Sequence, residues 1–138
     1  MRLVSFLAGD AAPRIGIVVA DGIVDLGRHL PQAPRDMVAL IAQWDHFGPQ
    51  LQQLAASAGP ADHAPGAVRL TAPVPRPGKM LGTGLNYADH IAESGLPEPT
   101  EQVWFAKAVS AVNGPFDAIQ LPRVSEALDY EAELAFVI

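Results

Sequence analysis

The sequence has 138 residues and a net charge of −6, with 49% hydrophobic and 17% charged residues, enough apolar material for a packed core and too much for a disordered chain. The acidic balance and the lack of a lysine or arginine cluster exclude a nucleic-acid partner, and the absence of cysteine excludes disulfides and thiolate chemistry. The N-terminal apolar run is too short for a signal peptide, and no segment approaches the ~20 apolar residues of a membrane span, so we expect a cytoplasmic protein with no membrane partner.

The N-terminal part is expected to open with strands. Residues 1–9 and 14–27 are rich in valine and isoleucine and are interrupted by glycine, which is typical of short strands. Asp21-Gly22 lies between two apolar runs and predicts a hairpin turn.

Two helices are expected to follow. Residues 34–44 and 47–59 repeat apolar side chains every three or four positions, and Gly59-Pro60 would end the second helix. The next stretch, 59–78, is dense in proline and glycine and indicates an extended connector with one short strand. We therefore predict an N-terminal α/β domain over 1–70 and a second domain over 71–138. His29, His46 and His63 lie in polar surroundings and are expected at the surface.

The second part begins with the pattern of a strand, a glycine turn and a short helix over 79–95. Asn86 is expected as the N-cap of this helix, with Asp89 at capping-box spacing, and Gly95 as its end. Residues 103–112 and 118–122 read as strands on either side of an Asn113-Gly114-Pro115 turn.

The final stretch, "LDYEAELAFVI", reads as a strand over 129–138. Alternation would then place Asp129, Glu131 and Glu133 on one face. Two carboxylates at positions i and i+2 of a strand are suited to hold a hard cation such as Mg²⁺ or Mn²⁺. The same pattern also fits a solvated acidic rim, and the residues alone leave both interpretations open.

A second candidate site lies on the predicted short helix. His90 and Glu93 are three residues apart and can touch, as in a histidine base oriented by a carboxylate, although an incidental surface pair has the same spacing. Lys107 follows an apolar strand and on its own would be a solvated strand end. The Gly82-Thr83-Gly84 turn lacks a dinucleotide or P-loop signature and favours close backbone approach to a small molecule.

In this order, "GTGLNYADHIAESG", "WFAK" and "LDYEAELAFVI" resemble the start of the catalytic domain of the fumarylacetoacetate hydrolase family, over residues 79–138. The resemblance implies an α+β protein: a small N-terminal α/β module followed by the beginning of a mixed β-roll catalytic domain. It implies that Glu131 and Glu133 are two of three acidic ligands of Mg²⁺ or Mn²⁺, that His90 and Glu93 activate water, and that Lys107 stabilises negative charge. Gly82, Gly84, Asn86 and Tyr87 are the expected substrate-binding residues.

The implied function is metal-dependent cleavage of a C–C bond in a β-diketo or acylpyruvate-type 2-oxo acid. Decarboxylation of oxaloacetate, isomerisation and hydration within the same family are alternatives, and an inactive fragment or interaction module is the alternative of another class. The family's third acidic ligand would follow residue 138, so we expect an incomplete catalytic domain that binds metal weakly and is catalytically poor. We expect the complete protein to be a homodimer.

Overall fold

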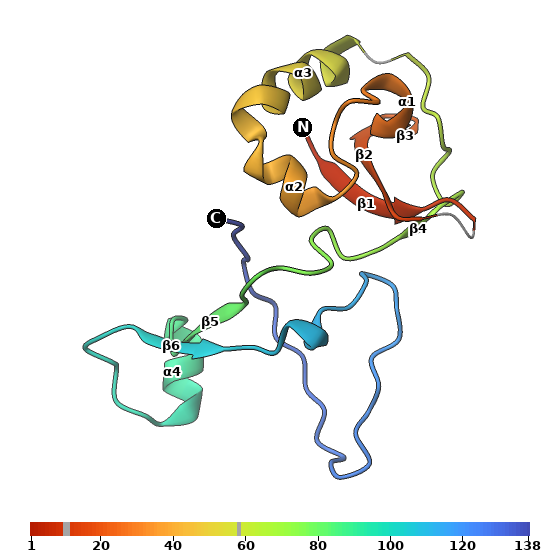
Figure 1. The fold of residues 1–138 in the computed structure, drawn as a ribbon. Coiled ribbons are helices and arrows are strands. Elements are labelled where there is room, and N and C mark those ends of the chain that lie inside the picture. Colours follow the sequence, from red (N-terminus) through yellow and green to blue (C-terminus); the bar gives the residue numbers. More distant parts are fainter. Residues whose placement is uncertain (10–11, 58) are drawn as a thin grey trace.

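The computed structural model describes residues 1–9, 12–57 and 59–138 and contains two antiparallel sheets (Figure 1). The first has four strands in the order β3-β2-β1-β4, and the second has the order β5-β6. The elements are β1 (Leu3–Leu7), β2 (Arg14–Val19), β3 (Gly22–Asp25), α1 (Leu26–His29), α2 (Met37–Ala42), α3 (Trp44–Ser57), β4 (Arg69–Leu70), β5 (Leu81–Gly84), α4 (Ala88–Ser94), β6 (Val103–Ala106) and the 3-10 helix η1 (Val109–Ala111).

The predicted hairpin of the first sheet is confirmed. Strands β2 and β3 pair antiparallel, with Val19 opposite Gly22, so the turn itself is Ala20-Asp21, one residue earlier than expected. Gly22 has φ +145°, and a Cβ there would collide with the carbonyl oxygen of His63. Glycine is therefore required where the connector passes alongside the hairpin.

The core lies between the first sheet and its helices (Figure 1). The two predicted helices are confirmed as α2 and α3, and the Asp36 side chain caps α2 by accepting a 3.0 Å bond from Ala39 N. Leu40 of α2 and Leu51 of α3 are completely buried. The buried cluster consists of Ile15, Ile17, Val24, Leu26, Ala33, Met37, Leu40, Phe47 and Leu51.

The second part of the chain is more open. Strands β5 and β6 form a hairpin with Gly82 opposite Phe105, and α4 lies between them in the sequence (Figure 1). Gly95 ends α4 in the left-handed conformation, as predicted, with φ +65°. The N-cap, however, is Tyr87 without a side-chain bond, so the prediction that Asn86 caps this helix is wrong.

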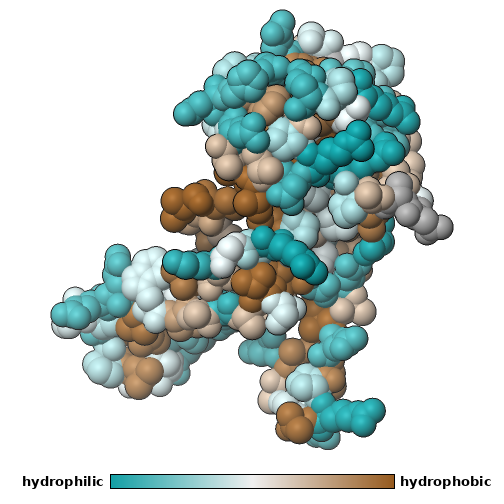
Figure 2. All heavy atoms as spheres, viewed as in Figure 1, coloured by the Kyte–Doolittle hydropathy of each residue, from teal (hydrophilic) through white to brown (hydrophobic). Residues whose placement is uncertain are grey.

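The predicted strands over 118–122 and 129–138 are absent, and the chain there has no regular structure. A strand needs a neighbour for its backbone groups, and no described residue forms a ladder with either segment. The last residues are exposed, and Figure 2 shows hydrophobic atoms at the surface where Figure 1 places the C-terminal end. The α+β class is confirmed, whereas the mixed β-roll and the boundary near residue 70 stay predictions.

The connector 59–78 runs along the first sheet and contributes β4. His63 forms a β-bridge with Ile23 and its ring packs 5.3 Å from the ring of Phe6. Only 14% of the His63 side chain is exposed, so the expectation that it lies at the surface is wrong, while His29 and His46 are exposed as expected.

In the described parts of the chain no helix is both long and apolar enough to span a bilayer.

Candidate functional site

Strand pairing fixes Lys107 at the end of the β5–β6 hairpin. Its backbone N–H donates to the carbonyl of Met80 at 2.9 Å, which extends the ladder by one bond. Its ammonium nitrogen lies 5.7 Å from the centre of the Phe105 ring, within range of a cation–π attraction. The side chain is 41% exposed and can reach a ligand beside the hairpin.

The C-terminal segment passes beside Lys107. Glu133 Oε2 lies 3.9 Å from Lys107 Nζ, and the backbone N–H of Leu134 donates to the hydroxyl of Tyr87 at 3.4 Å. Tyr87 immediately precedes α4, so the hydroxyl contact joins the segment to the start of that helix. Three residues singled out in the sequence, Tyr87, Lys107 and Glu133, are thereby brought to one region although they come from separate elements.

His90 and Glu93 share the exposed helix α4, but no hydrogen bond or ion pair joins their side chains in the described structure. The orienting contact expected for a water-activating pair is therefore not formed in this arrangement. Both side chains are exposed, and no residue of α4 is buried. Their predicted roles stay predictions.

Gly82 and Gly84 lie within strand β5, so the prediction of a glycine turn over 82–84 is wrong. The two glycines differ in their surroundings. A Cβ on Gly82 would lie 2.6 Å from Cζ of Phe105, so this glycine makes room for an aromatic ring across the hairpin. A Cβ on Gly84 would meet Val103 at an ordinary 3.4 Å. The ring of Phe105 gives Gly82 a packing role that sequence reasoning did not identify.

A small cavity of about 270 Å³ lies at the end of β5. Two of the predicted substrate-binding residues, Gly84 and Asn86, line it. Between them Leu85 has φ +52°, a conformation that non-glycine residues rarely adopt and that is found disproportionately at functional sites. The remaining lining residues are Thr83, which belongs to the glycine segment singled out in the sequence, and Leu85, Pro99, Thr100, Glu101, Gln102 and Val103.

The carboxylates of the last segment suit a hard divalent cation in chemical type, since oxygen ligands are those that Mg²⁺ and Mn²⁺ prefer. Glu131 and Glu133 are exposed, and among the described residues Glu133 forms its ion pair with the Lys107 ammonium. No group of three or more acidic or histidine side chains is arranged to hold a metal among the residues that the structure describes. The strand that was expected to align the two glutamates is also absent.

The family model described as the C-terminal domain of fumarylacetoacetate hydrolase matches residues 79–138. Across the whole chain, the sequence is 38% identical to the mitochondrial oxaloacetate tautomerase fahd2 of Xenopus laevis, and it covers 44% of that protein. It is 41% identical to a Burkholderia ambifaria protein named "Putative hydrolase", over 89% of the chain and 42% of that protein.

A solved structure gives the same assignment. The crystal structure of a "putative HpcE protein" from Mycobacterium smegmatis superposes with a TM-score of 0.69 at 36% identity, covering 88% of this chain and 41% of the other. Residues 79–138 are thereby assigned to the fumarylacetoacetate hydrolase family, as their motifs indicated. The chain spans a little under half the length of the curated relatives described above.

Proposed function

We propose that this chain supplies part of the active site of a divalent-metal-dependent enzyme that acts on 2-oxo acids. The observation that carries the proposal is the approach of Glu133 to Lys107, with Tyr87 bonded to the next residue, beside the helix that bears His90 and Glu93. A carboxylate for a cation, an ammonium for a developing anion and a histidine for proton transfer are the groups that enolate chemistry requires.

Keto–enol tautomerisation of oxaloacetate is the reaction that we propose first. The similarity of this whole chain, its N-terminal part included, to 44% of an oxaloacetate tautomerase supports it. In this reaction His90 would move a proton to or from the substrate, and Lys107 would face the oxygen that becomes negative. Glu131 and Glu133 would hold the cation, which when bound would polarise the 2-oxo group and stabilise the enolate.

Cleavage of a C–C bond in an acylpyruvate-type acid is the second candidate. The similarity to the Burkholderia protein named a hydrolase favours it. Here His90, turned toward Glu93, would remove a proton from the attacking water, and Lys107 would stabilise the resulting oxyanion. The two candidates share their residues and differ in whether water takes part.

The test uses the full-length gene product with Mg²⁺ or Mn²⁺. Loss of the enol absorbance of oxaloacetate and cleavage of acylpyruvates are followed separately, in the wild type and in His90→Ala. We expect His90→Ala to lower the rate of the reaction that the wild type catalyses by about 100-fold or more. His46→Ala, which removes an exposed histidine from α3, should leave this rate unchanged. Turnover of neither substrate class would refute the proposal, and full activity of His90→Ala on oxaloacetate would favour decarboxylation.

A protein that continues through the full family length is further proposed to form a homodimer, as the family resemblance implies. Light scattering of the full-length gene product at micromolar concentration measures this directly. A monomer under those conditions would contradict it.

A further inference from the structure

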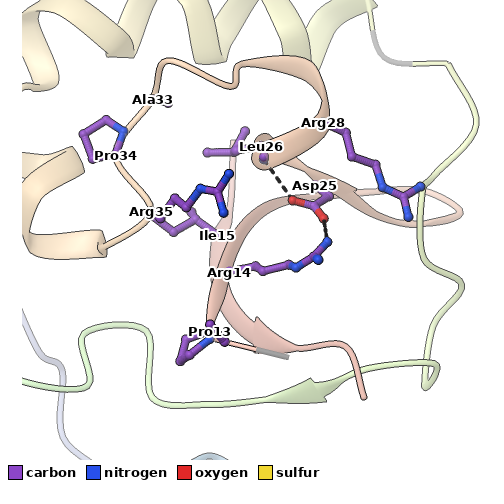
Figure 3. A pocket seen from close by; sticks show the side chains of 11 residues that line it. Pro13, Arg14, Ile15, Asp25, Leu26, Arg28, Ala33, Pro34 and Arg35 are labelled. Carbon is purple, nitrogen blue, oxygen red and sulfur yellow. Dashed lines mark hydrogen bonds and ion pairs between the residues drawn. The ribbon is translucent and has the colours of Figure 1, made fainter. Parts of the chain in front are cut away.

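A larger cavity, of about 590 Å³, lies in the N-terminal part of the chain (Figure 3). Its volume is within the range of about 300–1,000 Å³ that small-molecule sites occupy. Neither the family's motifs nor the candidate site above includes any of its residues. It is lined by Ala12, Pro13, Arg14, Ile15, Asp25, Leu26, Gly27, Arg28, Ala33, Pro34 and Arg35.

The lining is basic in an acidic protein. It contains three arginines and one carboxylate, whereas the chain as a whole has a net charge of −6. The carboxylate, Asp25, has no exposed surface and binds Arg14 at 2.6 Å. The guanidinium of Arg28 is engaged with Asp62 at 3.2 Å and, in Figure 3, extends away from the other two arginines.

Among the three arginines of the lining, Arg35 is the one that pairs with no described acidic group. No acidic group of residues 1–9, 12–57 and 59–138 forms an ion pair with it, and the neighbouring Asp36 is used as the cap of α2. Figure 3 shows the side chains of Arg14 and Arg35 beside Ile15 and Leu26. An anion placed there would meet the Arg35 guanidinium, which no described acidic group pairs with. It would also meet Arg14, which keeps N–H groups available because 40% of its side chain is exposed.

The walls are apolar and pre-formed. Ile15, Leu26 and Ala33 belong to the buried core, and Pro13 and Pro34 have restricted backbones. Asp25 fixes the remaining side by accepting from both Arg14 and Gly27 N, the latter at 2.9 Å. A cavity whose walls are already ordered costs little to reorganise when a ligand binds.

We propose that this cavity binds a small organic acid, with its carboxylate held by Arg35 and Arg14 and its apolar body on Ile15, Leu26 and the two prolines. The proposal does not rest on the function proposed above, because it concerns a separate set of residues. A bare inorganic anion would leave the apolar walls uncovered, and a neutral apolar molecule would leave Arg35 without a partner.

The test is an NMR titration of the 138-residue chain with benzoate, which has one carboxylate and one apolar ring. We expect saturable shifts of the amides of Ile15, Leu26 and Gly27. Arg35→Gln should weaken benzoate binding by about fivefold or more, as expected for the loss of a charge-assisted hydrogen bond. Arg35 is exposed, so this variant should keep the fold, which its amide spectrum verifies.

The matched control is Arg76→Gln, which removes an exposed arginine outside the cavity and should bind benzoate like the wild type. Benzyl alcohol and inorganic phosphate should each bind at least about tenfold more weakly than benzoate. The proposal fails if no saturable shift appears at these amides up to about 20 mM benzoate. It also fails if Arg35→Gln binds as the wild type does, or if phosphate binds as tightly as benzoate.

Discussion

Asp25 is a carboxylate without exposed surface, and three parts of the N-terminal fold depend on it. It caps α1 through Gly27 N, pairs with Arg14 of β2 and lies 3.6 Å from Nε2 of His63. That nitrogen is buried and has no hydrogen-bond partner among the described residues. Removing the Asp25 side chain would therefore break a cap and an ion pair together.

We expect Asp25→Ala to lower the free energy of unfolding by about 2–3 kcal/mol, since a buried charged acceptor with two partners is lost. Urea denaturation followed by tryptophan fluorescence measures this. Asp117→Ala is the control, because its pair with Arg69 is exposed and should contribute no more than about 1 kcal/mol. Equal effects of the two variants would contradict the assigned role of Asp25.

Asp62 makes stability depend on pH. Burial acts to raise the pKa of Asp62, but hydrogen bonds from Asp25 N and the side chains of His29 and Arg28 outweigh it, and the pKa falls below its ordinary 3.8. A lowered carboxyl pKa stabilises the fold fully above the unfolded value, and this contribution is lost as the pH falls through the folded value.

We therefore expect the wild type to lose stability between about pH 5 and pH 2 more steeply than Asp62→Asn, which cannot titrate. Urea unfolding at a series of pH values gives the two slopes. Asp36→Asn controls for removal of a carboxylate that caps a helix and belongs to no such network. Parallel wild-type and Asp62→Asn curves would contradict the prediction.

The burial of His63 could not be predicted from the residues near it in the sequence. The polar, proline-rich run around it predicted a surface residue, but the bridge to Ile23 draws its backbone onto the sheet and its ring onto Phe6. Nothing local encodes a contact 40 residues away, because it arises from the path of the connector. For the same reason the sequence did not identify the Asp25–Asp62 network.

At the scale of elements, the patterns succeeded where partners are close in sequence. The β2–β3 hairpin, α2, α3 and the end of α4 at Gly95 follow from local spacing and turn residues. The pattern over 129–138 failed, because alternation specifies which face a side chain would take and supplies no neighbouring strand. Lys107 and Glu133 nevertheless approach each other. The expectation that they share a site rested on the family resemblance, because no local pattern links them.

The β5–β6 hairpin offers a pair of neighbouring glycines for comparison. Gly82→Ala should displace the ring of Phe105, because a Cβ would lie 2.6 Å from it, and should change the surroundings of Lys107. Gly84→Ala should leave the ring in place, since its Cβ has ordinary contacts. Gly82→Ala should lower the free energy of unfolding by less than about 2 kcal/mol, because only the tip of the half-exposed Phe105 side chain must move.

Aromatic proton NMR reports the displacement. The Phe105 ring signals should shift in Gly82→Ala and remain near their wild-type positions in Gly84→Ala. Unchanged Phe105 signals in Gly82→Ala would show that the ring does not pack on this glycine.

At the scale of the whole molecule, the 138-residue chain should bind a divalent cation weakly. Two exposed carboxylates, one of them near an ammonium, are fewer ligands than a tight Mg²⁺ or Mn²⁺ site provides. Calorimetric titration should give a dissociation constant of about 1 mM or weaker. Glu133→Gln should weaken cation binding further, whereas Glu126→Gln should leave it unchanged. Micromolar binding of the cation by the wild type would refute this expectation.

Burial is divided unevenly between the two parts of the chain. Every residue of 79–138 is described, and only Gly82 among them is buried, whereas the core residues all lie in 1–72. The cooperative heat absorption of a melting experiment would therefore arise almost wholly from the part without the proposed catalytic residues. A cation or substrate that orders the second part would reveal itself less by raising the melting temperature than by enlarging the enthalpy and heat-capacity change of unfolding.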